Sequence, residues 1–358
     1  MGRKIRVGII FGGKSAEHEV SLQSAKNIVE AIDTERYEPV LITVDKKGQW
    51  FLMNSEHFLL NSENNEVRHS VALVPQSEGR MVNLDTHESN SSTDVAFPIL
   101  HGPFGEDGTI QGLLKLANIP FVGASVLGSA VGMDKDVMKR LLLNAEIPTG
   151  TFLACKEKDV PTYAKVVKSV GLPFFVKPAN MGSSIGVSKV SKEKEYTTAI
   201  QEAYTYDRKI LIEENIEGRE IECSVLGNDD PIASVPGEVI SNKGFYSYEA
   251  KYIDEHGATL EFPAKLSDEI IKKVQELAIK TFKTLCCEGL GRVDFFLTEN
   301  GDLFVNEINT LPGFTSTSMY PKLWEISGIS YTELIDRLIQ LALERFEKEQ
   351  KLKTTYVA

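Results

Sequence analysis

A hairpin near the end of the chain constrains the fold more than any other segment. Residues 291–309 read GRVDFFLTENGDLFVNEIN, two apolar runs separated by Asn300-Gly301, which is the strongest short-range signal for a two-residue type I′ turn. With that turn, every pair across the hairpin keeps the same sum of residue numbers. Because strand side chains alternate between faces, four polar side chains then share one face. The two cross-strand pairs are Asp294 with Glu307 and Arg292 with Asn309.

The shared face of this hairpin predicts a metal site. Two carboxylates placed directly across a ladder repel each other, and a divalent cation held between Asp294 and Glu307 removes that cost. Carboxylate and amide oxygens are ligands that suit Mg²⁺. Acidic residues on a solvent-facing sheet are the alternative interpretation. The next segment, TLPGFTSTSM at 310–319, favours the metal, because its turn and hydroxyl groups offer donors to an oxyanion and so predict phosphate chemistry.

Length and charge narrow the possible functions. A chain of 358 residues predicts two or three domains, and its net charge of −12 argues against binding nucleic acid or an anionic membrane surface. An anionic ligand therefore needs a local basic pocket. The four cysteines have no zinc-type spacing and suggest no disulfide framework. Since we find no signal peptide and no apolar stretch of membrane-spanning length, we expect a soluble cytoplasmic protein.

The order of elements predicts an α/β fold in three parts. A strand at 3–11, a helix at 20–32 and a strand at 39–44 predict an open parallel α/β domain whose ligand edge lies at the strand C-termini. We expect residues 45–92 to be less regular, and a further strand at 94–100. The expected domains are 1–123, 124–213 and 214–358; the last contains strands at 219–227 and 231–240, a Gly/Tyr-rich segment at 241–256, and helices at 268–287, with Ser267 as its N-cap, and at 331–348.

Two glycine-containing segments at the first strand and after residue 100 carry candidate ligand groups. Residues 8–15 match a phosphate-loop pattern, but Ile9 to Phe11 belong inside the strand, so we reject it as a nucleotide site. Glu17, which follows, is placed to meet an ammonium group or only to complement a helix dipole. His101 begins the loop HGPFGEDGTIQG, whose glycines allow the backbone to approach a ligand closely. A lone histidine is more often structural, but this one lies at the ligand edge of the strand, which favours a functional loop.

A lysine at a strand end indicates a phosphate-binding loop. Lys177 precedes the sequence PANMGSSIGV, and its point charge with the loop's N–H groups and hydroxyls can bind phosphate oxygens. A flexible hairpin with an exposed lysine is the alternative. The stretch 213–220 suits adenine and ribose recognition, although acidic loops are common.

Taken in order, seven segments resemble the ATP-grasp superfamily, and within it the D-alanine–D-alanine ligases of bacterial peptidoglycan synthesis. The resemblance implies a three-domain ATP-grasp fold with an N-terminal Rossmann-like domain, nucleotide between the second and third domains, and substrate facing the first. The segments are GGKSAEHEVS at 12–21, HGPFGEDGTIQG at 101–112, MDK at 133–135, FVKPANMGSSIGV at 175–187, YEAKY at 248–252, GRVDFFL at 291–297 and NEINTLPGFTSTS at 306–318.

The resemblance also implies a role for each matching residue. The reaction is ATP-dependent ligation of two D-alanine molecules through a D-alanyl phosphate, with ATP and two Mg²⁺ ions (or Mn²⁺) as cofactors and a homodimer as the assembly. ATP would contact Lys135, Lys177, Ser183, Ser184, Glu213, Glu214, Ile216, Glu220 and Lys251, and the metals would bind Asp294, Glu307 and Asn309. The substrates would meet Glu17, His101, Lys251, Arg292, Ser318 and Met319; Arg292 and the Gly313 N–H would stabilise the oxyanion, and Glu17, Ser183 and Tyr252 would form a hydrogen-bonded trio that joins the mobile loop at 241–256 to the site.

Two positions bear on specificity. Glu214 and Asn215 replace a Lys-Trp pair of some relatives, which puts the adenine contacts in doubt, whereas Tyr252 favours an amine over D-lactate as the second substrate. The alternatives are another ATP-dependent carboxylate–amine ligase, a D-alanine–D-lactate ligase, or a nucleotide-binding regulator without turnover. Arg292 argues against the regulator, because binding alone needs no oxyanion-stabilising arginine.

Overall fold

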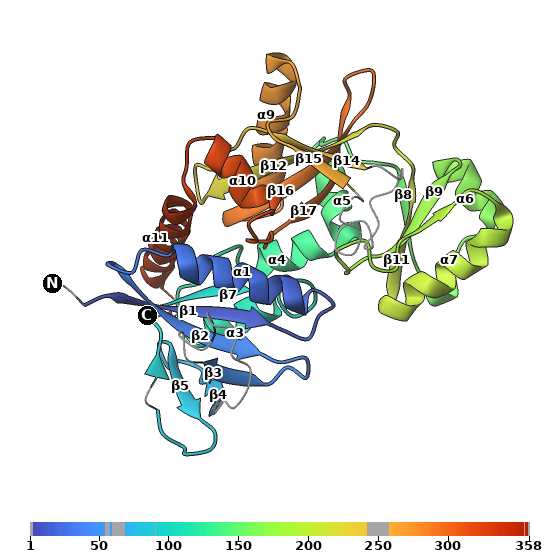
Figure 1. Ribbon diagram of the computed structural model, residues 1–358. Helices are drawn as coiled ribbons and strands as arrows, with labels where there is room; N and C mark the ends of the chain where they lie inside the picture. The colour runs from blue at the N-terminus through green and yellow to red at the C-terminus, as the bar shows by residue number, and fades with distance from the viewer. Residues whose placement is uncertain are drawn as a thin grey trace.

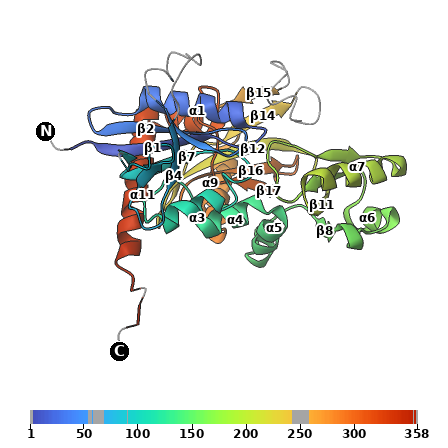
Figure 2. The ribbon, with the colours of Figure 1, turned by 90° about the horizontal axis from the view of Figure 1, so that it is seen from below.

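The computed structural model describes residues 3–53, 58, 69–89, 91–241, 258–353 and 355–356. These residues form three β-sheets with helices between and around them, a mixed α/β architecture (Figure 1). The first sheet and the second lie at opposite ends of the molecule in Figure 2, with strands of the third sheet between them. No helix in the described part of the chain is both long and apolar enough to cross a membrane.

The N-terminal sheet is mixed, and only part of it is parallel. Its strand order is β6-β5-β4-β3-β2-β1-β7, and β2, β1 and β7 pair in parallel, as the sequence predicts. Residues 45–92, expected to be irregular, instead supply four antiparallel strands at one side of the sheet. These strands are short, and β4 and β5 bury one side chain each, so they leave little alternation to read. The bounds are β1 Ile5–Gly12, β2 Tyr37–Val44, β3 Trp50–Met53, β4 His69–Leu73, β5 Arg80–Asn83, β6 Ser91–Ser92 and β7 Val95–Ile99.

The second sheet is antiparallel, in the order β10-β9-β11-β8. Aromatic and aliphatic side chains of α6 and α7 pack with its inner face into a separate core, which includes Val166, Phe174 and Tyr196. The bounds are β8 Phe152–Lys156, β9 Phe174–Pro178, β10 Ser188–Val190, β11 Lys209–Glu214, α6 Tyr163–Val170 and α7 Glu193–Tyr206, with a 3₁₀ turn at Glu157–Asp159.

The third sheet, in the order β15-β14-β12-β16-β17 with β13 beside β12, has one buried and one polar face. Alternation in β16 turns Val293 and Phe295 toward helix α9, whose N-cap Ser267 accepts a hydrogen bond from Ile270 N, as predicted. The opposite face carries the charged side chains. The bounds are β12 Arg219–Gly227, β13 Ile232–Ala233, β14 Gly237–Ser241, β15 Ala258–Glu261, β16 Gly289–Leu297, β17 Leu303–Asn309 and α9 Asp268–Thr284.

The hairpin of β16 and β17 keeps its predicted polar pairs by a different route. Thr298 N donates to Asp302 O and Gly301 N donates to Thr298 O, both at 3.0 Å, so the loop has three residues and the predicted two-residue turn is wrong. Gly301, at φ +83°, supplies the left-handed residue that this loop requires. A bulge at Asn306 then shifts the register back by one. The two deviations cancel, and the predicted pairs Asp294–Glu307 and Arg292–Asn309 are confirmed.

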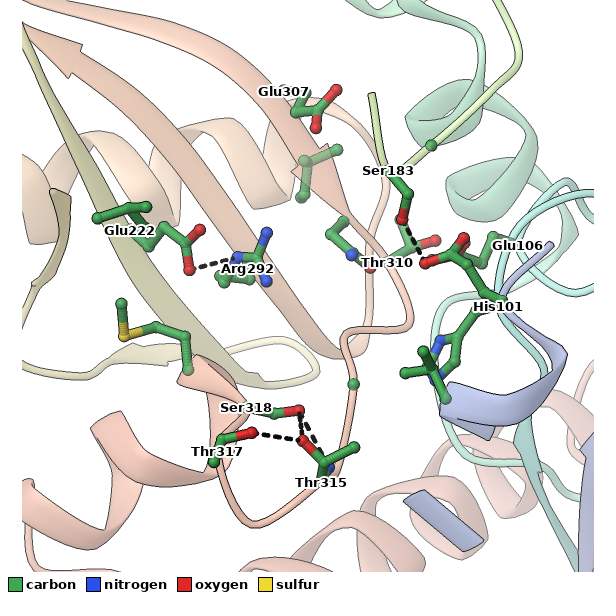
Figure 3. Close-up of a pocket in the computed structure, with 18 of the residues that line it drawn as sticks. His101, Glu106, Ser183, Glu222, Arg292, Glu307, Thr310, Thr315, Thr317 and Ser318 are labelled. Atoms are coloured by element: carbon green, nitrogen blue, oxygen red, sulfur yellow. Dashed lines mark hydrogen bonds and ion pairs between the residues drawn. The ribbon is translucent and has the colours of Figure 1, made fainter. Parts of the chain in front are cut away.

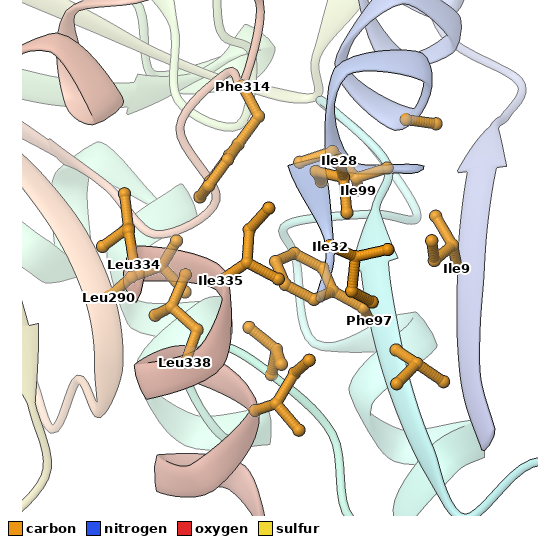
Figure 4. Close-up of a cluster of buried hydrophobic side chains, with 14 of the residues drawn as sticks. Ile9, Ile28, Ile32, Phe97, Ile99, Leu290, Phe314, Leu334, Ile335 and Leu338 are labelled. Carbon is orange, nitrogen blue, oxygen red and sulfur yellow. The ribbon is translucent and has the colours of Figure 1, made fainter. Parts of the chain in front are cut away.

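One hydrophobic core joins the N-terminal sheet to the C-terminal part of the chain. The same buried cluster contains Phe97 of β7, Phe314 of the loop after β17, and Leu338 of the last helix, α11 (Figure 4). Phe314 is further tied to α1, because its N–H donates to Ser24 Oγ at 3.1 Å. The loop that follows β17 is thereby held against the N-terminal sheet. The remaining helices are α1 His18–Ala31, α3 Thr109–Leu116, α4 Val126–Met133, α5 Lys135–Asn144, α10 Met319–Ile326 and α11 Tyr331–Gln350.

Candidate active site

The described residues line two adjoining cavities where the three sheets meet. The larger, of about 760 Å³, lies between the N-terminal loops, the third sheet and the loop after β17. The smaller, of about 400 Å³, lies between the second and third sheets. Both are lined by Lys135, Gly182, Ser183 and Glu307, so these four residues mark the junction of the two cavities.

Glu17 and the Gly-Ser-Ser loop meet at this junction. Ser183 Oγ donates to Glu17 Oε1 at 2.5 Å, which links the start of α1 to the loop after β9. Ser183 and Ser184 both adopt left-handed backbone conformations, with φ of +52° and +58°. Such conformations are uncommon outside glycine and mark strained, functional loops. The predicted Glu17–Ser183 contact is therefore present; its third member, Tyr252, lies outside the described residues, as do Lys251 and the predicted lid.

His101 and Glu106, both labelled in Figure 3, are buried, and each interacts with the charge of Glu17. His101 Nδ1 donates to Leu311 O at 3.0 Å, and burial lowers the pKa of His101, so the ring is neutral with a lone pair on Nε2. That Nε2 has no hydrogen-bond partner among the described residues. Burial, with the nearby charge of Glu17, raises the pKa of Glu106 to about 8, and Glu106 Oε2 accepts from Gly102 N at 2.6 Å. A protonated carboxyl and a neutral imidazole thus both interact with Glu17 at neutral pH.

Arg292 is held on the polar face of the third sheet by two carboxylates, Asp294 and Glu222, and Figure 3 shows its contact with Glu222. Its Nε and Nη2 donate to the two oxygens of Asp294, each at 2.7 Å. Its Nε also lies 3.0 Å from Glu222 Oε2. Burial opposes the charge of Arg292, but Asp294 and Glu222 outweigh it and raise its pKa well above the usual value. The guanidinium is a permanent positive charge at the wall of the larger cavity.

Lys135 ties the Gly-Ser-Ser loop to the hairpin. It begins α5, whose N-cap Asp134 accepts from the N–H groups of residues 136 and 137. Its Nζ donates to Met181 O at 2.7 Å and lies 3.2 Å from Glu307 Oε2. A ligand that spans the two cavities therefore passes this ammonium.

The smaller cavity is built around a buried chain of charges. Lys177 Nζ donates to Glu213 Oε1 at 2.7 Å, and Lys139 Nζ lies 3.4 Å from Glu213 Oε2. Lys139 also donates to Thr149 Oγ1 at 2.7 Å. Burial opposes ionisation of Glu213, but the two lysines outweigh it and lower its pKa. Every described residue predicted to contact ATP lines this cavity: Lys135, Lys177, Ser183, Ser184, Glu213, Glu214, Ile216 and Glu220.

The loop after β17 closes the other end of the larger cavity. Thr315 N and Thr315 Oγ1 lie 3.0 and 2.7 Å from Ser318 Oγ, which fixes the hydroxyls at the N-terminus of α10. A Cβ at Gly313 would lie 2.9 Å from the same Ser318 oxygen, so a larger residue would crowd this turn. Free N–H groups at a helix N-terminus suit a carboxylate. Ser318, Met319 and Gly313 all line the cavity, as predicted.

Comparisons with known proteins find one family along most of the chain. The family model "D-ala D-ala ligase N-terminus" matches residues 6–124, and "D-ala D-ala ligase C-terminus" matches residues 141–340. The D-alanine–D-alanine ligase of Shouchella clausii is 55% identical over 98% of both chains. D-alanine–D-alanine ligase A of Escherichia coli K12 is 50% identical over 98% of this chain and 99% of that one.

The chain belongs to the D-alanine–D-alanine ligase family. Solved structures agree with this assignment. The Coxiella burnetii D-alanine–D-alanine ligase superposes with a TM-score of 0.89 at 39% identity, covering 98% of this chain and 97% of that one. The VanG D-Ala:D-Ser ligase of Enterococcus faecalis superposes with a TM-score of 0.86 at 36% identity, covering 95% of this chain and all of that one.

For a member of this ligase family, the predicted metal ligands have suitable chemistry. Asp294 and Glu307 lie directly opposite each other, with Asn309 one pair further along the same face. Two carboxylates and an amide are oxygen donors that hard cations prefer. No group of three or more His, Cys, Asp and Glu side chains in the described segments is arranged to hold a metal. In this structure the Asp294 oxygens face Arg292 instead, so a cation has to compete for them.

Three residues of the site have no role predicted from the sequence. Glu106 stood inside a quoted loop, but only its burial singles it out. Lys139 lies one helical turn after Lys135, a spacing that places both on one face of α5. Glu222 lies directly opposite Asp294 on β12, a pairing that the local sequence does not reveal.

Proposed function

We propose that the chain joins two molecules of D-alanine through a D-alanyl phosphate, with the residues of the two cavities in the roles set out below. The ATP-dependent ligase activity follows from membership of the family, with a relative 55% identical over 98% of the chain. The observation that carries the residue roles is the junction itself. A phosphate donor in the smaller cavity and a carboxylate acceptor in the larger meet at Lys135, Ser183 and Glu307.

The smaller cavity takes ATP. Lys177 and Lys135 bind its phosphates, and Ser183 and Ser184 present a loop that covers them. Glu213, Glu214, Ile216 and Glu220 line the adenine and ribose end. Glu213 also holds Lys177 by a 2.7 Å ion pair, so the lysine is oriented before the nucleotide arrives. This arrangement supports the ATP-grasp fold with nucleotide between the units 124–213 and 214–358, and a Rossmann-like unit at 1–123.

Asp294, Glu307 and Asn309 are the residues that hold Mg²⁺ or Mn²⁺. Two such ions would neutralise the charge that develops on the transferring phosphoryl group. Lys135, 3.2 Å from Glu307, contributes a further positive charge on the same side of the cavity. The chain's own part is to position the acceptor carboxylate beside these groups and to keep water out.

The larger cavity takes both D-alanine molecules. Glu17 accepts the ammonium of the first, held in place by Ser183, with His101 and Lys251 as auxiliary polar contacts. The unprotonated amine of the second attacks the carbonyl carbon of the acyl phosphate, and the C–O bond to phosphate breaks so that inorganic phosphate leaves. The carboxylate of the second is bound at Ser318 and Met319. Arg292 and the Gly313 N–H stabilise the tetrahedral oxyanion, worth about 3–4 kcal/mol for a well-placed donor. Tyr252 completes the trio with Glu17 and Ser183, and the assembly stays a predicted homodimer.

The test is phosphate release from ATP and Mg²⁺ with D-alanine, L-alanine, or D-alanine plus D-lactate, followed by product mass. We expect release with D-alanine but not with L-alanine alone, and a product two alanines long in both reactions that contain D-alanine. A mixed product with D-lactate would reassign the second site. Absence of release with all three, in a protein that still binds ATP, would overturn the proposed substrates.

A further inference from the structure

Three carboxylates lie in one row across the third sheet. Glu222 of β12 is directly opposite Asp294 of β16, and Asp294 is directly opposite Glu307 of β17. All three are on the polar face, because Ile221 and Cys223, which flank Glu222, are fully buried in the core on the other side. Like charges directly opposite one another destabilise a sheet. Such a row requires cations to be stable.

The described cations serve this row unequally. Lys135 lies 3.2 Å from Glu307, at one end. Arg292 contacts the other two carboxylates from the neighbouring row. Its Nε and Nη2 donate to Asp294. Its Nε also lies 3.0 Å from Glu222, the contact drawn in Figure 3. One guanidinium is therefore shared by two carboxylates, and Asp294 holds the larger share.

A metal ion at Asp294 changes this balance. Both oxygens of Asp294 accept hydrogen bonds from Arg292 in this structure, so an ion that binds there competes with the guanidinium for the charge and the lone pairs of this carboxylate. Arg292 is only 18% exposed at its side chain, and a buried charge without a partner is costly. Glu222, already in contact and 11% exposed at its side chain, is the carboxylate to which Arg292 can turn without leaving its place.

We propose that Glu222 is a positioning residue that takes over Arg292 when a divalent cation takes Asp294. This inference rests on the proposed metal site at Asp294 and Glu307. Glu222 thereby allows Asp294 to bind a metal while Arg292 keeps a carboxylate partner. Asp294 binds the metal. Arg292, two residues earlier on the same face of β16, stays charged and oriented toward the reacting carboxyl group.

The test is a double-mutant cycle read by metal binding without turnover. Free Mn²⁺ is measured by electron paramagnetic resonance during titration of wild type, Glu222→Gln, Arg292→Gln and the double variant. We expect Glu222→Gln to raise the dissociation constant about tenfold in the wild-type background and to change it little in the Arg292→Gln background. An equal loss in both backgrounds would show that Glu222 acts only as a nearby negative charge, and would overturn the proposal.

Two further variants separate geometry from charge. Glu222→Asp keeps the charge but shortens the reach to Arg292, so we expect it to weaken Mn²⁺ binding as Glu222→Gln does. Wild-type affinity in Glu222→Asp would contradict the proposal. Glu238→Gln is the matched control, because Glu238 makes a comparable pair with Arg219 on the same sheet, at 2.8 and 2.6 Å, away from Asp294.

The metal titration also distinguishes a wrong role for Glu222 from a wrong metal site. If wild type binds Mn²⁺ and the cycle shows no coupling, only the role of Glu222 fails. If wild type binds no Mn²⁺ at millimolar concentration, the metal assignment fails and this inference with it, whatever phosphate release shows. A thermal melt of each variant checks that the fold is intact.

Discussion

The two cavities each contain a buried carboxyl group, and the pKa values of the two groups are shifted in opposite directions. Glu213, in the smaller cavity, lies between two lysines that outweigh burial and lower its pKa. Glu106, in the larger, is buried beside another acid, and its pKa is raised to about 8. The comparison shows that burial alone does not decide the charge of a group. What decides it is whether a cation is built in at the same depth.

The difference extends to the cations themselves. Lys139 and Lys177 have side chains that are 1% and 9% exposed, and both are committed to Glu213. Arg292, 18% exposed, is shared between Asp294 and Glu222. The charges of the nucleotide cavity are thus fixed as part of the fold, whereas those of the substrate cavity can exchange partners as ligands bind.

Removal of Glu213 tests the fixed side of this comparison and has the largest expected effect. Glu213→Gln leaves two buried lysines without their carboxylate, so we expect it to lower the free energy of unfolding by about 3–5 kcal/mol. Urea denaturation followed by circular dichroism measures this. Glu214→Gln is the matched control. The Glu214 carboxylate accepts a hydrogen bond from Thr151 N, and a glutamine oxygen can keep this contact. We therefore expect Glu214→Gln to lower the free energy of unfolding by about 0.5 kcal/mol or less. Equal small losses would remove the distinction between the cavities.

Arg292 tests the exchangeable side. Arg292→Lys keeps a cation near Asp294 and Glu222 but loses the two-pronged geometry, so kcat should fall about 10²–10³-fold while the free energy of unfolding changes by about 1 kcal/mol or less. Steady-state phosphate release and urea denaturation give the two values. Arg219→Lys removes the same geometry from the pair with Glu238, and we expect it to leave turnover unchanged. If Arg292→Lys unfolded as readily as Glu213→Gln, Arg292 would be as structural as Lys139.

The sequence predicted the polar face of the hairpin correctly even though the turn was wrong. Alternation and the pairing of Asp294 with Glu307 depend only on the net register, which the bulge at Asn306 restores. The described residues predicted to contact ATP line one cavity, because most of them lie at or near the ends of β9, β11 and β12, with Lys135 at the start of α5. The four short strands within residues 45–92 were missed, since one buried side chain in a strand gives no period.

The sequence could not predict residues whose role depends on burial or on pairing with a strand that is distant along the chain. Glu222 becomes significant only because β12 pairs with β16, across about 70 residues of chain, at a register that puts it opposite Asp294. Lys139 and Glu106 are distinguished by burial, which depends on how three sheets pack together. Local patterns specify which face a side chain is on, but tertiary packing specifies which charges share that face.

The pH dependence of stability tests the contrast between the two carboxyl groups directly. The pKa of Glu106 rises from an ordinary 4.5 to about 8 on folding, so the folded state binds more protons than the unfolded state between those pH values. Its stabilising contribution is complete below pH 4.5 and is lost as the pH rises toward 8, on the order of 1 kcal/mol per pH unit. Glu106→Gln stays neutral throughout, so wild type should become less stable relative to the variant from pH 5 to 8. Urea denaturation at each pH measures this difference. Asp107→Asn is the control, because the wild-type Asp107 carboxylate lies nearer the surface and accepts hydrogen bonds from Phe104 N and Thr109 N. A difference that stays constant with pH would mean that Glu106 is ionised, like Glu213, and that the substrate cavity also carries a built-in cation for it.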